Sequence, residues 1–296
     1  MGSAATPEHL AALPSDGAAR LALGTMRLLD WQLDPRDLAR FLAQAADAGV
    51  GVLDTADIYG GGEVEPALGS AFREAPGLRG RFRIVGKCGI RLRAGDVGVK
   101  HYDTSRAHLT ASVDRTLRCL GTDHLDLLLL HRPDPLLDPD DLAGTFAELR
   151  DSGRVRAFGL SNFRPAQADL LRARLNLPLV AHQVEASLWH PDPVLDGTLD
   201  HARLAGLAPM AWSPLGGGRA APPVLAAALE RLGRSLELTP AQVALAWLAR
   251  HPARMMPVLG TGRIERIREG VAAMATLLHR EAWFELLEAA TGHAVP

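Results

Sequence analysis

Short apolar runs alternate with longer amphipathic segments along most of the chain. A run such as Leu125–Leu130 is apolar throughout, which is typical of a parallel strand covered on both faces. The segments between the runs have the spacing of amphipathic helices, and some begin with a capping residue followed by proline, as at Asp34-Pro35. The eight runs are Leu21–Gly24, Val50–Leu53, Phe82–Gly86, Leu125–Leu130, Val155–Leu160, Leu179–His182, Leu207–Ala211 and Met256–Leu259. The eight helical segments are 36–48, 63–73, 105–120, 139–152, 165–174, 196–205, 240–251 and 263–278.

This alternation predicts the fold class. Eight βα units follow one another without a dividing linker rich in glycine, serine or proline. We therefore predict an α/β fold, a (β/α)8 TIM barrel that forms a single domain over residues 1–296. We expect residues 1–18 to be poorly ordered. An open, doubly wound sheet is the alternative, but the number and even spacing of the runs favour the barrel.

Composition narrows the class of protein. Hydrophobic residues make up 47% of the 296 and charged residues 22%, as in an ordinary soluble globular protein. The formal charge of −2 gives no electrostatic reason to expect a nucleic acid or a membrane surface as partner. Cys88 and Cys119 are too few for a disulfide framework, so we predict a cytoplasmic protein. No histidines or cysteines have metal-ligand spacing, and we expect no metal.

Polar residues or glycines follow most of the apolar runs. In a barrel, the carboxyl ends of all strands meet at one mouth, where barrel enzymes keep their chemistry. Residues far apart in the sequence would therefore share one pocket. The residues at these positions are Asp54, Lys87, His131, Ser161, Asn162, Gln183, Trp212, Ser213, Gly260 and Thr261.

Lys87 is one of only two lysines in a chain with thirty arginines. A compact ammonium can be desolvated beside a phenol, whereas a guanidinium is bulky and planar. Tyr59 follows Asp54 by five residues, and a cation within about 4–6 Å lowers the pKa of a phenol from about 10. We predict that Lys87 lowers the pKa of Tyr59 toward neutrality, that Asp54 holds the ammonium, and that His131 donates a hydrogen bond to a substrate oxygen. Together they describe a general acid for a carbonyl oxygen.

Each of these residues alone has a structural explanation. Asp54 could cap a loop, Tyr59 could lie at the edge of the core, and His131 could satisfy backbone groups. Their occurrence in order on successive strands favours the catalytic interpretation. A Schiff-base enzyme with Lys87 as nucleophile is a further alternative.

The same motifs resemble the aldo-keto reductase family. Leu53–Gly60 is similar to the family's aspartate–tyrosine signature, and Lys87 and His131 fall where its lysine and histidine would. Gly159–Phe163 and Gly260–Arg263 resemble its cofactor segments. The resemblance implies NADPH-dependent reduction of an aldehyde or ketone to an alcohol. The segment after the histidine is most similar to bacterial members nearer the potassium-channel β-subunit branch. That branch suggests a second hypothesis, a nicotinamide-binding redox sensor with little turnover.

The resemblance also implies roles for the cofactor-binding residues. Ser161, Asn162 and Gln183 would bind the nicotinamide carboxamide, and Trp212 would stack on the ring. Gly270 stands where many relatives have asparagine, which leaves the adenine contact open. The complete set predicted to bind the cofactor is Gly24, Thr25, Met26, Ser161, Asn162, Gln183, Trp212, Ser213, Leu215, Gly216, Gly217, Gly260, Thr261, Gly262, Arg263 and Arg266.

Substrate choice should come from the loops around the mouth. Trp31, Trp189 and His190 are predicted to line the substrate pocket, because they follow the first and sixth apolar runs. Segment 89–104 is basic, which suggests a substrate with some negative charge. Segment 213–239 could close over the dinucleotide as a lid. We expect a monomer, because no predicted helix has an apolar stripe left over.

Overall fold

A computed structural model of the chain describes residues 20–95 and 97–294. The expectation for residues 1–18 concerns a segment outside these ranges. Eight strands form the barrel: β1 (Ala22–Gly24), β2 (Val52–Asp54), β3 (Arg83–Cys88), β6 (Leu127–Leu130), β7 (Phe158–Ser161), β8 (Leu179–Glu185), β9 (Ala208–Trp212) and β10 (Met256–Leu259). All pair in parallel, in the closed order β1-β10-β9-β8-β7-β6-β3-β2. The predicted barrel is confirmed.

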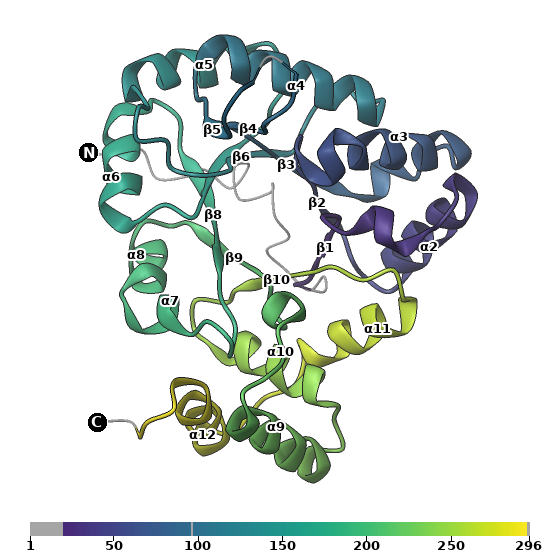
Figure 1. Cartoon of the computed structure of the whole chain (residues 1–296), viewed down its shortest axis with the longest axis vertical. Coiled ribbons are helices and arrows are strands. Elements are labelled where there is room, and N and C mark those ends of the chain that lie inside the picture. Colours follow the sequence, from purple (N-terminus) through teal and green to yellow (C-terminus); the bar gives the residue numbers. More distant parts are fainter. Residues whose placement is uncertain (1–19, 96, 295–296) are drawn as a thin grey trace.

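Helices surround the strands, as Figure 1 shows in a view of the whole ring. Eight of them match the predicted segments: α2 (Pro35–Asp47), α3 (Val64–Glu74), α4 (Arg106–Leu120), α5 (Pro139–Asp151), α6 (Pro165–Arg174), α8 (Thr198–Leu204), α10 (Pro240–Arg250) and α11 (Ile264–Ala273). The predicted start signals are used. Asp34 accepts a hydrogen bond from the Asp37 amide, and Thr239 forms a capping box with Gln242.

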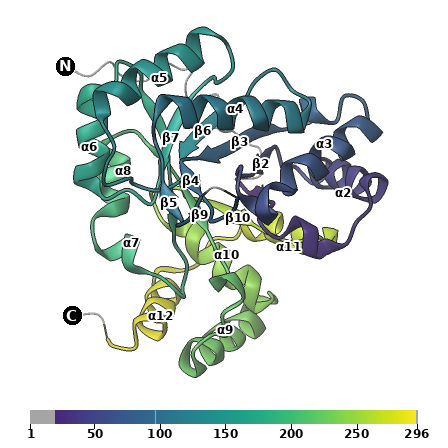
Figure 2. The same cartoon turned by 45° about the horizontal axis from the view of Figure 1, so that its top comes forward.

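Several elements go beyond the eight predicted units. A short hairpin of β4 (Ile90–Arg91) and β5 (His101–Tyr102) follows β3. The additional helices are α7 (Asp192–Leu195), α9 (Pro223–Leu236) and α12 (Arg280–Thr291), and the 3-10 turns are η1 (Leu28–Trp31), η2 (Tyr59–Gly62), η3 (Arg79–Arg81) and η4 (Gly216–Gly218). Figures 1 and 2 show α9 and α12 side by side outside the ring, next to α10. No helix of the described residues is long and apolar enough to cross a membrane.

Helix α12 is attached through a pair of tryptophans. The rings of Trp247 in α10 and Trp283 in α12 stack with centroids 5.1 Å apart and planes 8° from parallel. Each indole N–H donates to the other residue's carbonyl oxygen, at 3.1 and 3.0 Å. The two large rings thus bury apolar area while their polar groups remain satisfied.

The alternation of side chains along the strands positions the site. One cluster of buried side chains fills the barrel interior: Ala22, Val52, Val85, Leu127, Leu129, Ala157, Val180, Ala181, Met210, Met256 and Val258. Because side chains alternate with period two, the residues two positions further on face the same way. Asp54 follows Val52, Lys87 follows Val85 and His131 follows Leu129. Cys88 has the opposite orientation and packs, buried, in the core between strands and helices.

Candidate active site

Lys87 and Asp54 form a buried ion pair at the carboxyl end of β3 and β2. The Lys87 ammonium donates to Asp54 Oδ1 at 2.6 Å and to the Thr55 carbonyl oxygen at 2.8 Å. The second carboxylate oxygen accepts from the Gln183 amide at 2.6 Å. Both charged side chains are at most 3% exposed. The ammonium is therefore fixed in position, and a carboxylate compensates its charge.

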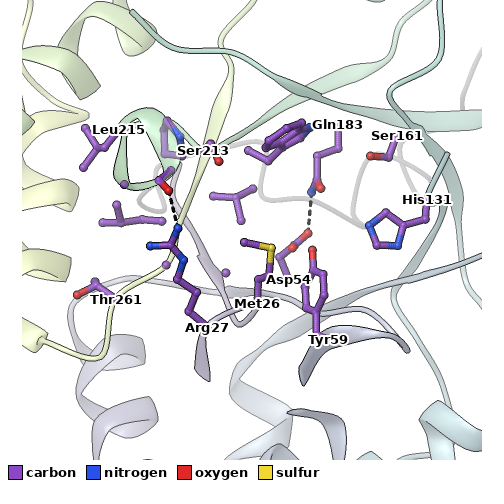
Figure 3. A pocket seen from close by; sticks show the side chains of 18 of the residues that line it. Met26, Arg27, Asp54, Tyr59, His131, Ser161, Gln183, Ser213, Leu215 and Thr261 are labelled. Atoms are coloured by element: carbon purple, nitrogen blue, oxygen red, sulfur yellow. Dashed lines mark hydrogen bonds between the residues drawn. The ribbon is translucent and has the colours of Figure 1, made fainter. Parts of the chain in front are cut away.

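Tyr59 lies against this pair at the start of η2. The Lys87 Nζ atom is 4.8 Å from the centroid of the Tyr59 ring. The chain makes this turn with Gly60 and Gly61 in the left-handed region, at φ 58° and 68°, where glycine is tolerated best. The His131 ring meets the Tyr59 ring edge-on, with centroids 5.9 Å apart. Tyr59, Asp54 and His131 face the same space in Figure 3. The structure thus brings the four predicted catalytic residues together.

The pKa of Tyr59 differs from the sequence prediction. Burial raises the pKa of the phenol, and the opposing effect of the Lys87 charge is too small to reverse that rise. The prediction of a lowered value was wrong because it weighed the cation and not the loss of water, which disfavours the phenolate. Tyr59 is consequently a neutral phenol, the protonation state that a proton donor needs.

Lys87 is charged at neutral pH, whereas His131 is not. Burial lowers the pKa of Lys87, but attraction to Asp54 and Tyr59 more than compensates, and the net pKa is raised. Burial first, and then the charges of Lys87, Arg132 and Lys100, lower the pKa of His131 to about 3. Lys87 is therefore a cation at neutral pH, whereas His131 is a neutral imidazole that can donate one N–H.

These residues lie at one end of a cavity of about 840 Å³. A space of this size accommodates a large ligand together with a small one. Asp54, Tyr59 and His131 line it, while Lys87 lies behind Tyr59 and Asp54. The residues predicted to bind the cofactor that line the cavity are Gly24, Met26, Ser161, Asn162, Gln183, Trp212, Ser213, Leu215, Gly217, Gly260, Thr261 and Arg266.

An amide-rich wall lies beside the catalytic residues. Asn162 donates to Ser161 Oγ at 2.8 Å and to the His131 carbonyl oxygen at 3.3 Å. Its own side-chain oxygen accepts from the Trp212 indole at 2.9 Å. Asn162 and Ser213 both have positive φ values, 64° and 51°. Such strain is common at functional sites. The wall presents the polar groups that a carboxamide such as nicotinamide requires.

The other end of the cavity has features that suit the phosphates of a dinucleotide. Gly217 and Gly218 line the cavity after β9, with φ values of 63° and 94°. Without side chains, their backbone can approach a pyrophosphate closely. Arg27 donates to the Gly217 carbonyl oxygen and also lines the cavity (Figure 3). Thr261 and Arg266 lie beyond, where an anionic phosphate would meet a cation. The residues present therefore fit a nicotinamide dinucleotide.

Four residues predicted to bind the cofactor do not line the cavity. Thr25 is fully buried and donates to the Asp54 carbonyl oxygen at 2.9 Å, so its hydroxyl is already used. Gly216 is covered by the Trp189 ring, and Gly262 by the Trp31 ring. Arg263 is an exposed residue that precedes α11. These positions support the cavity or flank it.

The three residues predicted to line the substrate pocket lie elsewhere, which corrects that prediction. The partly buried Trp31 packs edge-on against the core residue Phe41, with centroids 5.4 Å apart. Trp189 packs against η4, where a side chain at Gly216 would collide with its ring. His190 faces Asp192, 3.8 Å away. All three follow strand ends, but the two tryptophans pack against neighbouring residues and His190 lies beside an aspartate.

Other lining residues were not predicted as site residues. The catalytic end also has Ile58, Ile90, Lys100, Tyr102 and Arg132, and the opposite end has Gln242 and Glu269. Arg132 had a signal in the sequence, because it directly follows His131. Tyr102 and Lys100 reach the cavity from the hairpin after β3, and the sequence did not reveal that hairpin. In the described residues, no group of three or more histidines, cysteines and acids is placed to hold a metal.

A second buried polar cluster lies behind the catalytic turn, between η2, α3 and α4. Asp57 accepts a hydrogen bond from Ser112 at 2.6 Å, and Glu65 accepts from Thr116 at 2.9 Å. Burial raises the pKa of Asp57 to about 6 and that of Glu65 to about 7. Arg115 is the cation nearest to this cluster, 3.9 Å from Glu65. Both acids therefore change charge near neutral pH.

The barrel and its mouth define the class of protein. A charged lysine behind a neutral tyrosine, next to a cavity suited to a dinucleotide, is the arrangement of a barrel oxidoreductase. Residues 20–290 match the model of the Aldo/keto reductase family. The chain belongs to this family, as the motifs indicated, and it is an NAD(P)H-dependent oxidoreductase.

Individual relatives agree with this assignment. Oxidoreductase YdhF of Escherichia coli (strain K12) is 46% identical over 288 residues, which cover 94% of this chain and 95% of that protein. The 6-dehydroglucose reductase of Agrobacterium fabrum is 42% identical over 284 residues, 94% of this chain and 96% of that protein. A crystal structure of an aldo-keto reductase from Klebsiella pneumoniae in complex with NADPH has a TM-score of 0.77 at 25% identity, covering 94% of this chain and 92% of that one. The similarity to the channel-subunit branch stays a prediction.

Proposed function

We propose that the protein reduces an aldehyde or ketone to an alcohol with NADPH, and that Tyr59 is the general acid. The observation that carries this proposal is the placement of the neutral Tyr59 phenol, 4.8 Å from ring centroid to the Lys87 ammonium, on the wall of the cavity. Two relatives with the name 6-dehydroglucose reductase support a reductase activity.

The chain's own residues explain how a carbonyl oxygen would be protonated. NADPH, when bound, supplies the hydride. Tyr59 donates its proton to the oxygen as negative charge develops there, and the phenolate that remains lies beside the Lys87 ammonium. Asp54 and the Thr55 carbonyl oxygen keep that ammonium in place. His131 offers a neutral N–H to the same oxygen. A proton transfer of this kind contributes about 10²–10⁴-fold to rate.

The preference for NADPH is part of the proposal. Arg266 lines the end of the cavity beyond Thr261, and a guanidinium pairs well with a 2′-phosphate. Glu269 lies on the same helix and would repel that phosphate if it came near. We expect Arg266→Ala to raise the KM for NADPH at least tenfold and to leave that for NADH nearly unchanged. Equal effects on both would contradict the preference.

The decisive test is Tyr59→Phe. The wild type should oxidise NADPH through many turnovers when 4-nitrobenzaldehyde is added. The variant should lose at least a hundredfold in kcat, while its NADPH dissociation constant, measured by quenching of protein fluorescence, stays within about twofold. A variant with the wild-type rate would refute the role of Tyr59. Tight NADPH binding without repeated turnover in the wild type would favour the redox sensor instead.

We also propose that the enzyme acts in the cytoplasm as a monomer on a small-molecule carbonyl, with no nucleic acid or membrane as partner. Two free cysteines and a formal charge of −2 support this view. One chain has a mass of 31.6 kDa, and light scattering at micromolar concentration should return that value. A mass twice as large would exclude the monomer.

A further inference from the structure

Two basic side chains line the cavity at its catalytic end. Arg132 directly follows His131 at the end of β6, and Lys100 directly precedes β5 in the hairpin after β3. They come from different elements, yet both line the same cavity as Tyr59 and His131. The proposed catalytic mechanism assigns no role to either side chain.

Neither cation has a counter-charge among the residues that the structure describes. Within residues 20–95 and 97–294, no carboxylate lies within 4.0 Å of Arg132 or Lys100, which is the range of an ion pair. The Arg132 guanidinium lies over the Trp212 ring instead, 5.7 Å from its centroid. Two carboxylates of the described residues line the cavity: Asp54 is bound to Lys87 and Gln183, and Glu269 lies on α11 at the cofactor end. The catalytic end therefore carries an excess of positive charge.

The positive charges of Arg132 and Lys100 lie near His131, where the substrate carbonyl would react. The positive charges of Arg132 and Lys100 both help to lower the pKa of His131, so they lie close enough to influence it. Arg27, another arginine that lines the cavity, is different, because it donates to the Gly217 carbonyl oxygen on the cofactor side. Arg132 and Lys100 remain free to meet the substrate.

The choice of residue types is informative. Lys100 is the second of only two lysines in the chain, and arginine occupies the other thirty basic positions. An ammonium on a flexible stem can follow an anion whose position varies, whereas a guanidinium fork fixes a planar one in two hydrogen bonds. Coming from different elements, the two side chains can together hold one anionic group. Ile58, Ile90 and Tyr102 add apolar surface to the lining of the same cavity.

We propose that the substrate is an anionic carbonyl compound, an aldehyde or ketone whose carboxylate or phosphate is held between Lys100 and Arg132 while its carbonyl oxygen meets Tyr59 and His131. The idea rests on the proposed function. It narrows the substrate class to compounds that carry a negative group a few bonds from the carbonyl.

A matched pair of aldehydes tests the proposal. 4-Carboxybenzaldehyde and its methyl ester have the same ring and the same carbonyl, and differ in charge. The wild type should reduce the acid with a kcat/KM at least tenfold above that of the ester. Lys100→Met and Arg132→Met should each lower this preference, mainly through KM, and the double variant should bring it to about one. A second pair, glyceraldehyde 3-phosphate and glyceraldehyde, differs in a phosphate. A kcat/KM at least tenfold higher for the phosphorylated aldehyde would show that the site prefers a phosphate.

Control variants separate specific contacts from general charge. Arg93 is an exposed arginine of the same hairpin segment that does not line the cavity. Arg93→Met should leave the preference unchanged. Lys100→Arg should keep most of it, because the charge remains. Equal kcat/KM values for both members of each pair in the wild type would overturn the proposal.

A binding measurement distinguishes failure of this proposal from failure of the proposed function. Calorimetry of 4-(hydroxymethyl)benzoate with the NADP+-loaded protein does not depend on turnover. Binding at least tenfold tighter to the wild type than to the double variant supports the anion site even if no aldehyde is reduced, in which case only the reductase function fails. Equal binding to both overturns the site, whatever the activity.

Discussion

Asp54 connects several parts of the barrel mouth through its hydrogen bonds. Its carboxylate accepts from Lys87 and from Gln183, each at 2.6 Å, and its carbonyl oxygen accepts from the Thr25 hydroxyl at 2.9 Å. Three strands and one loop therefore depend on a single residue for their alignment at the mouth. A buried carboxylate with these partners sets both the position and the charge of the lysine.

Asp54→Asn should disturb both stability and catalysis. The variant leaves the Lys87 ammonium buried without its counter-charge, which costs about 3–5 kcal/mol. We expect a loss of apparent melting temperature and at least a tenfold fall in kcat. Asp47→Asn is the matched control, because Asp47 pairs with Arg81 at the surface and is 70% exposed. If Asp54→Asn melts with the wild type and the control, the buried pair contributes no stability.

The residues of the site were predictable to different extents. Asp54, Lys87 and His131 follow apolar runs, so the barrel pattern alone was enough to place them at one mouth. The sign of the Tyr59 pKa shift was not predictable, because the extent of burial is a property of the folded molecule. Trp31 and Trp189 also follow apolar runs, but their packing partners lie in other segments. Trp31 packs against Phe41 and Gly262, and Trp189 packs against Gly216. Position along a strand does not reveal which neighbour a ring will meet.

At the scale of elements, the turn that carries Tyr59 is held by α4. The Arg115 guanidinium donates to the carbonyl oxygens of Asp57, at 3.2 Å, and Gly62, at 2.7 Å. These two residues lie on either side of Tyr59. One side chain thus fixes both ends of a turn that contains three consecutive glycines.

Arg115→Met should loosen this turn. The variant removes the two hydrogen bonds and keeps much of the side-chain length, so we expect a loss of about 1–2 kcal/mol. The kcat should fall about threefold to tenfold because Tyr59 is less well placed, while the NADPH dissociation constant stays the same. Arg118→Met, three residues further along α4 and exposed, should change neither. An unaltered kcat in Arg115→Met would show that the turn holds Tyr59 without help.

The elements that the sequence did not predict are those outside the repeating pattern. Apolar runs predict the eight strands, and amphipathic spacing predicts their helices. Helix α9 lies within segment 213–239, which the sequence analysis interprets as a lid and not as a helix. Helix α12 comes after the last expected unit, and its attachment depends on Trp247, which is 36 residues away. Contacts of this kind exist only once the chain is folded.

At the scale of the whole molecule, the buried acids Asp57 and Glu65 link stability to pH. The pKa of Glu65 rises from 4.5 to about 7 in the folded protein. Between these values the folded state keeps a proton that the unfolded state has released. The free energy of unfolding therefore falls as pH increases through this window, and the loss is complete above the folded pKa. Asp57, with a pKa of about 6, acts in the same direction.

Glu65→Gln should remove most of the decrease in the free energy of unfolding that Glu65 causes as the pH rises. Glutamine can keep the contact with Thr116 and carries no charge at any pH. At pH 8 we expect the variant to be more stable than the wild type by about 2 kcal/mol, with no such advantage at pH 5. Thermal melting at both pH values measures this difference. Glu63→Gln, an exposed neighbour, should show no such dependence, and a gain that is equal at both pH values would exclude titration as the cause.

Closure of the barrel has a consequence for the synthesis of the protein. Strand β1 needs two neighbours, and one of them, β10, lies more than two hundred residues further along the chain. Ribosomes add about 5–20 residues per second, so β1 waits on the order of tens of seconds with one edge unpaired. An open edge of this kind recruits strands from other chains. The nascent polypeptide thus keeps an open strand edge until β10 leaves the ribosome, and chaperone demand should end at that point.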